Sequence, residues 1–394
     1  MYRIGQEEID AVTRVINSKE LFRINDKGRE VENFEKEFER KLGIEYSLAL
    51  SGGGTSALIA ALVGLEIGPG DEVLVPSYTF VSTAIAVLAV GAIPVIVEID
   101  DSLTICTIDM EKKISPYTKA VIPVHMRGFP CNMERIEELA KLYNLRIIED
   151  VCQAVGGSFR GERLGTIGDA GAFSFNQYKI ISSGEGGAMV TSLKEVYERA
   201  LIYHDVGSGF REFSNRLKTP IFAGVQYRAS EIMGAILREQ LKRLDGILED
   251  LRNIKKRIMN ELSTESDINF IKSYDDDGDC GTTVGLLFLN EECARKFASS
   301  KGVNGWLPID TGKHVYTGWQ TILEKRGSHH PLMNPYKRPE NQNLNMSYSK
   351  EMCPQTLDIL SRTVLLVIHP DLNEEDVTLL IKSCREAAKQ LIKL

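Results

Sequence analysis

The chain has 394 residues, 43% of them hydrophobic and 26% charged, which predicts two or three globular units and excludes long disordered or collagen-like stretches. Its 47 Lys and Arg residues against 55 Asp and Glu residues give a net charge of −8, which argues against nucleic acid as a partner. The 7 cysteines form no CxxC pair, residues 1–10 show no leader-like pattern, and no uncharged apolar run reaches about 18 residues, so we expect a cytoplasmic protein with reduced thiols and no membrane partner.

Helical and strand patterns alternate along the chain from residue 56 onward. A helix is predicted over residues 56–65, and the turn sequence of residues 68–71 ends it before a short buried strand at Glu72–Pro76. Further elements of the same alternation are expected at residues 94–99, 119–124, 132–143, 145–149, 170–175 and 187–191. Such alternation is typical of a parallel sheet with crossover helices, so the large unit is predicted to be α/β.

A long helical pattern over residues 230–262 is predicted to connect this unit to a smaller one. Beyond it, strand patterns at 281–289 and 363–368 and an amphipathic helix at 374–394 indicate an α+β unit. We therefore expect two domains, with residues 1–240 in a large α/β domain and residues 241–394 in a smaller C-terminal α+β domain.

Glycines and hydroxyl side chains open the first predicted helix. Gly52, Gly53 and Gly54 precede Thr55 and Ser56, a pattern in which the N–H groups at a helix start favour a phosphate. The run lacks the Lys of a Walker A loop and the spacing of a GxGxxG motif, so it does not indicate a nucleoside triphosphate or a dinucleotide. On its own, it is equally consistent with a capped glycine turn.

Two charged residues follow predicted strands, where a parallel sheet places its ligands. Asp150 comes at the end of a buried strand, and an anion there needs donors or a cation, either a structural partner or the protonated ring nitrogen of a cofactor. Lys179 lies in an uncharged stretch between two apolar strands, where desolvation favours the neutral amine that forms imines. The alternative for Lys179 is a solvated lysine in an exposed turn.

Several short motifs occur together in one order along the chain. They are Gly54-Thr55, Gly68-Pro69-Gly70-Asp71-Glu72-Val73, Thr79-Phe80, Glu149-Asp150 with Gln153-Ala154, Ser174-Phe175 with Lys179, Glu185-Gly186-Gly187, and Arg228 with Gln240-Leu241. In this combination the sequence resembles the DegT/DnrJ/EryC1/StrS family of sugar aminotransferases, from about residue 5 to 244 and more thinly from 353 to 380. The resemblance implies the α/β fold type I of enzymes that use pyridoxal 5'-phosphate (PLP), with a large, mostly parallel sheet domain and a smaller α+β domain.

The resemblance also implies a role for each matching residue. Lys179 would form the Schiff base with PLP and then act as general base and acid, while Asp150 would pair with the pyridinium nitrogen. The other cofactor contacts it implies are Thr55, Ser56 and Ser174 on the phosphate, Phe80 stacked on the ring, and Gln153 at the phenolic oxygen. Family members share their sites between two subunits, so a homodimer is expected. Gln226 departs from the family, which usually has Asn there to reach the phosphate held by the other subunit.

Basic side chains accumulate in residues 306–348, the stretch least like the family. Lys313, His314, Arg326 and His329 are therefore expected to bind an anionic acceptor, and Arg127 either brings charge to the cleft rim or solvates a loop. The stretch resembles aminotransferases that make 8-amino-3,8-dideoxy-manno-octulosonate for bacterial lipopolysaccharide, with the 8-oxo sugar acid as acceptor and L-glutamate as donor. A nucleotide-linked keto-sugar and an aminocyclitol ketone stay open as acceptors, and a solvated loop stays open for the stretch itself.

Two other classes of protein compete with an aminotransferase. A PLP-binding regulator would keep the pocket without turnover. A metal-dependent enzyme is disfavoured because the sequence has no HxH or HExxH motif, and the acidic run at residues 275–279 lacks the Glu expected at the twelfth position of an EF-hand. No metal site is predicted.

Overall fold

A seven-stranded, mostly parallel sheet organises the first half of the chain in the computed structural model, which describes residues 2–24, 28–265 and 268–391. The strand order is β1-β9-β8-β5-β4-β2-β3, and β9 runs antiparallel to both of its neighbours. The strands are β1 (Tyr46–Leu50), β2 (Glu72–Pro76), β3 (Ile93–Val97), β4 (Thr118–Val121), β5 (Arg146–Asp150), β8 (Ala170–Ser174) and β9 (Gly187–Thr191). The predicted α/β class is therefore confirmed.

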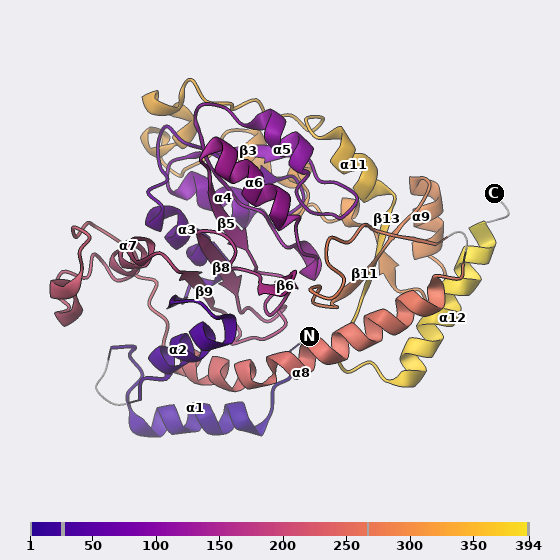
Figure 1. The fold of residues 1–394 in the computed structure, drawn as a ribbon, viewed down its shortest axis with the longest axis horizontal. Helices are drawn as coiled ribbons and strands as arrows, with labels where there is room; N and C mark the ends of the chain where they lie inside the picture. Colours follow the sequence, from indigo (N-terminus) through magenta and orange to yellow (C-terminus); the bar gives the residue numbers. More distant parts are fainter. Residues whose placement is uncertain (1, 25–27, 266–267, 392–394) are drawn as a thin grey trace.

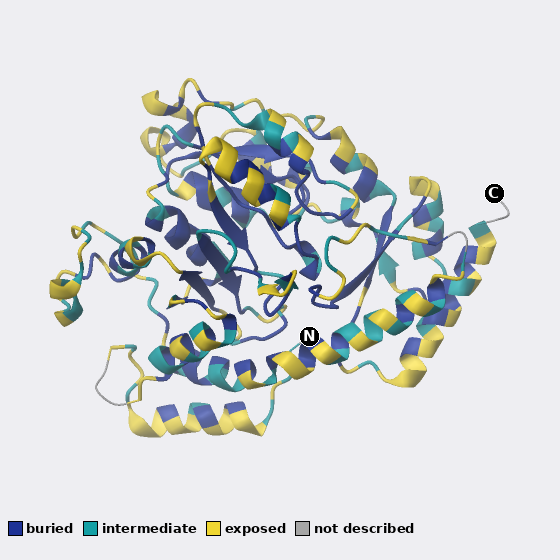
Figure 2. Ribbon diagram, in the orientation of Figure 1, coloured by how far each residue is buried: buried dark blue, intermediate teal, exposed yellow. Residues whose placement is uncertain are grey.

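Helices cover both faces of this sheet, so that its strands are buried between them (Figures 1 and 2). Side chains along β2 alternate between two clusters of buried residues, with Leu74 in one and Val73 and Val75 in the other. The covering helices are α2 (Glu30–Leu42), α3 (Gly53–Gly64), α4 (Ser82–Ala89), α5 (Thr107–Lys113), α6 (Met133–Tyr143) and α7 (Lys194–His204). Because α3 is apolar on nearly every side, it packs as a central helix rather than at the surface.

The long helix α8 (Glu231–Leu262) runs along the lower edge of the molecule, from α2 to the C-terminal elements (Figure 1). The side chain of Ser230 caps its start by accepting a hydrogen bond from the N–H of Met233. Helix α1 (Gln6–Ser18) packs against its first half. The domain boundary predicted at residue 240 falls inside this single helix, and the division into two domains stays a prediction.

A second, antiparallel sheet follows α8, in the strand order β10-β11-β13-β12. Its elements and covering helices are β10 (Asn269–Phe270), β11 (Thr283–Leu287), α9 (Glu291–Ala298), β12 (Gly305–Trp306), β13 (Thr363–Val367) and α12 (Glu374–Leu391). The strand expected at 281–289 is shorter because Gly281, at φ +78°, approaches the backbone of α8 so closely that a Cβ there would lie 2.6 Å from the Arg252 nitrogen. The end of the helix expected at 374–394 lies partly outside the described residues.

Short elements complete the chain. They are the hairpin β6 (Ser158–Phe159) and β7 (Glu162–Arg163), the helices α10 (Gln320–Leu323) and α11 (Pro354–Ser361), and the 3-10 turns at Met126–Gly128, Glu212–Arg216, Pro308–Asp310, Tyr316–Gly318, Pro331–Met333, Pro335–Lys337 and Pro339–Asn341. Glu98, just after β3, holds the start of α11 by accepting the N–H groups of Gln355 (3.1 Å) and Thr356 (2.7 Å). Within the described ranges, no helix is long and apolar enough to span a bilayer.

Candidate active site

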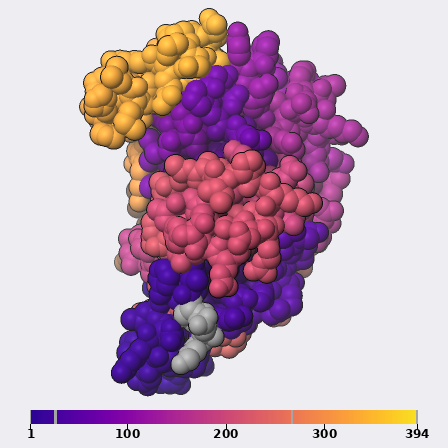
Figure 3. All heavy atoms as spheres, turned by 90° about the vertical axis from the view of Figure 1, so that its left-hand side faces the viewer, coloured from indigo at the N-terminus to yellow at the C-terminus, as the bar shows by residue number. Residues whose placement is uncertain are grey.

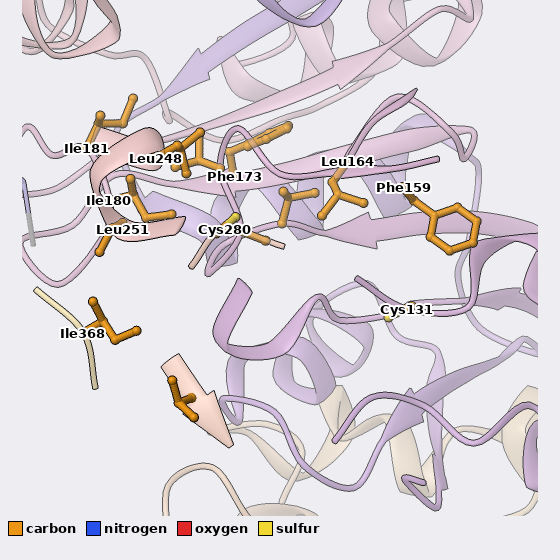
Figure 4. Packing of buried hydrophobic residues seen from close by; sticks show 14 of the residues in the cluster. Cys131, Phe159, Leu164, Phe173, Ile180, Ile181, Leu248, Leu251, Cys280 and Ile368 are labelled. Atoms are coloured by element: carbon orange, nitrogen blue, oxygen red, sulfur yellow. The ribbon is translucent and has the colours of Figure 1, made fainter. Parts of the chain in front are cut away.

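Lys179 lies in the turn between the antiparallel strands β8 and β9. The N–H of Lys179 donates to the carbonyl of Asn176 (3.0 Å), and Asn176 itself bridges to Gly184 on the returning strand. The next two residues, Ile180 and Ile181, are buried in one cluster with residues of α8 that include Leu248 (Figure 4). The turn is therefore anchored on the apolar side, and the backbone of Lys179 is fixed.

The environment of Lys179 favours its neutral amine. Burial lowers the pKa of Lys179, and the positive charges of Arg127 and Lys313 lower it further, while Asp150 acts in the opposite direction. A neutral amine is the form that attacks a carbonyl carbon and the form that accepts a proton. The expectation of a solvated lysine in an exposed turn does not match this half-buried position.

Asp150 is the last residue of β5 and is only 4% exposed. One carboxylate oxygen accepts a hydrogen bond from the hydroxyl of Thr83 (2.9 Å), and the other accepts one from the N–H of Cys152 (3.1 Å). In the described chain, Asp150 makes no ion pair with Lys, Arg or His. Two neutral donors offset only part of the cost of burying a carboxylate, so the site is suited to a cationic ligand atom.

Lys179 and Asp150 both line a cavity of about 220 Å³ at the carboxyl edge of the sheet, which we call the inner cavity. Its other lining residues include Gly52, Gly53, Gly54, Thr55, Phe80, Ser82, Thr83, Gln153, Ser174 and Glu185. The first N–H groups of α3 have no intrahelical partner, and they lie at this cavity. Glycine at position 54 makes room for the sulfur of Cys152, with which a Cβ there would collide.

The predicted phosphate contacts differ in where their side chains point. Thr55 and Ser174 line the inner cavity, and the hydroxyl of Thr55 donates to that of Ser82 (2.9 Å). Ser56 is buried, is not among the lining residues, and donates its hydroxyl to the carbonyl of Gly53 (2.8 Å). A phosphate contact from the Ser56 hydroxyl would first have to break that bond.

A larger cavity of about 400 Å³, the outer chamber, adjoins the inner cavity. The two cavities share Phe80, Cys152, Gln153, Asn176 and Lys179 as lining residues. The outer chamber is further lined by Arg127, Val155, Tyr178, Ile180, Thr282, Thr283, Trp306, Thr311, Lys313, His314 and Val367. Lys179 thus stands where a ligand of the inner cavity meets a ligand of the outer chamber.

A strap formed by residues 311–316 closes one side of the outer chamber. It pairs with the chain after β2 through hydrogen bonds from Thr79 N–H to the His314 carbonyl (2.9 Å) and from Val81 N–H to the Lys313 carbonyl (3.2 Å). The pairing sets the ring of His314 beside that of Phe80, with 5.7 Å between centroids. Lys313 and His314 are thereby brought to the site from far along the chain.

The outer chamber is cationic. Of the described residues that line it, none is Asp or Glu, whereas Arg127, Lys179 and Lys313 are basic. His314 adds no charge near neutral pH, because burial and then the neighbouring cations lower its pKa to about 3. Two fixed cations, Arg127 and Lys313, therefore flank the reactive lysine.

Three predicted site residues lie outside both cavities of this chain. Arg326 is exposed and pairs with Glu324 (2.8 Å), and His329 is exposed in the neighbouring loop. Gln226 is also exposed, on the segment that follows α7. The basic stretch at 306–348 therefore supplies the chamber with Lys313 and His314, and the structure does not bring the other two residues to it.

Sequence reasoning missed Thr83, Cys152 and Trp306 as site residues. Thr83 lies in an apolar helical pattern and Trp306 in a two-residue strand, so neither carries a local signal. Cys152 stands two residues after Asp150, and only the fold shows its sulfur packed against Gly54. In the described ranges, no group of three or more His, Cys, Asp or Glu side chains is arranged to hold a metal ion.

The residues of the inner cavity fit PLP. A buried acid without a cation partner suits a protonated ring nitrogen, a desolvated amine suits an aldehyde carbon, and the open helix start suits a phosphate. Phe80 offers its 43% exposed ring to both cavities. Together with the seven-stranded sheet, this arrangement defines the fold type I class of PLP enzymes.

The chain belongs to the DegT/DnrJ/EryC1/StrS aminotransferase family, whose model matches residues 2–291. Members of this family are PLP-dependent sugar aminotransferases. The chain is 30% identical to the spore coat polysaccharide biosynthesis protein SpsC of Bacillus subtilis (strain 168), over 98% of this chain and 95% of that protein. It is 38% identical over 243 residues to a GDP-perosamine synthase of Escherichia coli O157:H7, which is 61% of this chain and 65% of that protein. This chain therefore aligns with less than two thirds of the length of some relatives, including that synthase.

The fold is also similar to solved structures. DesV from S. venezuelae, solved in complex with a ketimine intermediate, has a TM-score of 0.75 and 29% sequence identity, covering 97% of this chain and 94% of that one. A DegT/DnrJ/EryC1/StrS aminotransferase from Brucella abortus has a TM-score of 0.76 and 26% identity, covering 96% of this chain and 95% of that one. The similarity therefore includes β12 and β13 of the second sheet, which lie beyond the segment that the family model matches.

Proposed function

We propose that this protein is a PLP-dependent aminotransferase that moves an amino group from L-glutamate to the carbonyl of an oxidised sugar. The observation that carries the proposal is that Lys179 and Asp150 line one cavity, next to a helix start suited to a phosphate. Glutamate would leave as 2-oxoglutarate, and the sugar carbonyl would become an amine, so that the two half-reactions balance without any other reactant.

The residues of the inner cavity have separate tasks in this proposal. Bound PLP supplies an electron sink when a C–H bond of the substrate breaks. Asp150 holds a positive charge on the ring nitrogen, and its bonds from Thr83 and Cys152 keep it oriented. Lys179 holds the cofactor covalently between turnovers and, once released, carries a proton on Nζ to and from the reacting carbon. The lowered pKa of Lys179 increases the neutral fraction of this amine at a given pH.

For the acceptor, we propose a sugar acid, and as best candidate 8-oxo-3,8-dideoxy-manno-octulosonate, which would give 8-amino-3,8-dideoxy-manno-octulosonate for lipopolysaccharide. The support is the outer chamber, where Arg127 and Lys313 are fixed cations and the described lining has no acid. A single carboxylate suits an Arg that can bind it with two parallel hydrogen bonds.

A nucleotide-linked keto-sugar is the second candidate, because relatives carry such names. Examples are the dTDP-3-amino-3,6-dideoxy-alpha-D-galactopyranose transaminase of Aneurinibacillus thermoaerophilus, 30% identical over 90% of this chain and 89% of that protein, and the GDP-perosamine synthase above. A diphosphate would also be attracted by the cations of the outer chamber.

One experiment tests both the activity and the acceptor. Purified protein loaded with PLP is mixed with L-glutamate, and the absorbance of the cofactor is followed from the pyridoxal to the pyridoxamine form. The pyridoxamine form is then offered the oxidised sugar acid or nucleotide-linked keto-sugars, and the return of the pyridoxal form is timed. No conversion by any amino-acid donor would refute the aminotransferase and favour a PLP-binding regulator. Conversion with glutamate but return only with nucleotide-linked sugars would refute the sugar acid.

We also propose that the active unit is a homodimer. Of the described residues that line the inner cavity, only Lys179 is basic, so a second source of phosphate contacts would complete the site. The segment after α7 stands out at one side of the molecule, where it forms the middle of the face in Figure 3. It is held by a buried Asp205 paired with Arg211 and Arg228, yet it exposes Phe210 (65%) and Ile221 (51%). Gln226, on this segment, would reach the cofactor of the other subunit.

Subunit mixing tests the shared site. If Gln226 acts across the interface, a mixed dimer of Lys179→Ala and Gln226→Ala chains has one site with both changes and one site with neither. If Gln226 acts on the partner's cofactor, mixing restores one site of parental cofactor affinity per mixed dimer. If Gln226 acts within its own chain, mixing restores nothing, and sedimentation at a monomer mass would refute the dimer itself.

A further inference from the structure

We propose that Arg127, assisted by Lys313, is a carboxylate anchor shared by both substrates, holding the amino-acid donor in the first half-reaction and an acidic group of the sugar in the second. This inference rests on the proposed function and names the chemical class of its acceptor. It also assigns a binding role to Arg127, which the sequence left open between the cleft rim and a solvated loop.

The guanidinium of Arg127 is an uncompensated cation. It is half-buried, its Nε is shielded from solvent without a hydrogen-bond partner in the described chain, and it makes no ion pair with a carboxylate there. Other half-buried arginines differ in this respect: Arg238 pairs with Glu30 (2.8 Å) and Glu37 (2.7 Å). A desolvated cation without a counter-ion is costly, and an anionic ligand in the outer chamber would remove that cost.

The backbone holds Arg127 in a strained position toward the chamber. Its φ is +58°, a left-handed conformation that is uncommon for a long side chain. Its N–H donates to the side-chain oxygen of Gln153 (3.2 Å), and its carbonyl accepts the hydroxyl of Thr282. The guanidinium carbon lies 4.6 Å from the centroid of the Trp306 ring. A flat guanidinium backed by an aromatic ring is preorganised to receive a planar carboxylate.

Lys313 is a second cation of the same chamber, placed there by the strap. It makes no ion pair in the part of the chain that the structure describes, and His314 beside it is neutral. The positive charges of both Arg127 and Lys313 are felt at Lys179, so the two cations lie near the reacting amine. Two cations beside one amine match glutamate, which carries two carboxylates in addition to its amino group.

One chamber must serve two substrates in turn, because the amino group is delivered at the same lysine in both half-reactions. The donor product leaves before the acceptor enters, so the acceptor meets the same two cations. A neutral sugar would leave the half-buried Arg127 without a counter-ion, which costs binding free energy, and would give the exposed Lys313 no carboxylate to pair with. The acceptor is therefore a sugar that carries an acidic group, and a carboxylate fits the planar site of Arg127.

The test compares Arg127→Gln, Arg127→Lys and Arg338→Gln with the parent enzyme, all loaded with PLP. Arg338 is a matched control, because it too is half-buried, has a shielded Nε without a partner and makes no ion pair in the described ranges, but it does not line the outer chamber. Glutarate, a dicarboxylate that cannot react, is titrated calorimetrically as the probe of the anchor. The glutamate half-reaction is then timed, and so is the second half-reaction, with the sugar acid and with the same sugar reduced at its carboxyl to an alcohol.

For Arg127→Gln we expect glutarate to bind about 10- to 100-fold more weakly and kcat/KM to fall by a similar factor for glutamate and for the sugar acid. Arg127→Lys should recover only part of this loss, because an ammonium cannot make the paired contact. The reduced sugar should react slowly with the parent and should be unaffected by Arg127→Gln. Arg338→Gln should match the parent in every measurement.

Parental glutarate affinity in Arg127→Gln, or a loss for only one of the two substrates, would overturn the shared anchor. A nucleotide-linked sugar that reacts equally well with parent and Arg127→Gln would overturn it too. These outcomes are distinct from failure of the proposed function, which would appear as a parent enzyme whose cofactor does not respond to glutamate. Retention of the parental melting temperature and cofactor content shows that the variants are folded.

Discussion

Gly54 and Cys152 pack against each other beside the inner cavity, which makes them suitable for a double-mutant cycle. A Cβ at position 54 would collide with the sulfur of Cys152 and would lie 3.2 Å from the Cβ of Ser174. In Gly54→Ala the sulfur must therefore move, and because Cys152 lines the inner cavity, rotation of its side chain carries the sulfur toward the space for the cofactor. We expect the substitution to weaken cofactor binding, and replacement of Cys152 to restore it.

The size of the effect follows from two opposing terms. Alanine favours the first turn of α3 over glycine by up to about 1 kcal/mol, and inserting a methyl group into a packed site costs about 1–3 kcal/mol. The clash should prevail, because the colliding atom belongs to a short side chain with few alternatives. If about 1.4 kcal/mol of this cost falls on the bound state, the Kd for PLP rises about tenfold. In Gly54→Ala with Cys152→Ala the clash with sulfur is gone, and only the tight contact with Ser174 remains.

The cycle needs four proteins and two measurements. Urea unfolding without cofactor gives the stability of each, and fluorescence titration with PLP gives the Kd of each. Cys152→Ala alone is the control, and it should bind PLP nearly as the parent does. We expect a coupling of about 1 kcal/mol or more between the two positions, whereas independent sites add to within about 0.5 kcal/mol. Additive effects would show that the sulfur does not limit the space at position 54.

Four further outcomes are expected. Lys179→Ala should lack the mass of a covalently trapped cofactor after borohydride reduction and should show no turnover; undiminished turnover would contradict its role. Asp150→Asn should keep its fold by circular dichroism while kcat falls by about 10²-fold or more, since a neutral amide cannot hold the ring nitrogen positive. Because the neutral amine reacts and burial lowers the pKa of Lys179, the rate of covalent attachment of PLP to the apoprotein should reach its plateau below pH 10.5, the ordinary lysine value; a rate that still rises through pH 10.5 would exclude this. Glu98→Gln should destabilise the fold by about 1–2 kcal/mol in urea, because the start of α11 loses a charged acceptor; an unchanged midpoint would show that the cap is dispensable.

The sequence predicts the strands best where they are buried on both faces. Strands β2 and β9 begin and end as predicted, because each is a short, fully buried and mostly apolar run between turn signals. Strand β1 was not predicted, since its pairing partner β9 lies far along the chain and its five residues carry no periodic signal. The two-residue strand β12 exists only through its pairing with β13. Pairing between distant segments is therefore the information that a local pattern lacks.

The same distinction divides the site. Asp150 and Lys179 follow the predicted strands β5 and β8, so their meeting at one edge of the sheet is implied by the sequence, whereas Gly54 follows the unpredicted β1. Thr83 could not be chosen from the sequence, because its contact with Asp150 depends on how α4 packs over the end of β5. The basic residues of the stretch 306–348 could not be ranked from the sequence. The pairing of the strap places Lys313 at the outer chamber, whereas Arg326 does not line it.

The position of each cavity along the chain also determines how much relatives can tell about the substrate. The residues of the inner cavity all lie within residues 2–291, the segment that the family model matches. Trp306, Lys313 and His314 of the outer chamber lie beyond it, whereas Arg127 lies within it. The cavity for the cofactor thus lies wholly inside the segment that the family model matches, whereas the chamber for the acceptor lies partly outside it. The family model therefore bears most directly on the cofactor, whereas the cations of the outer chamber are evidence from the part that would contact the acceptor.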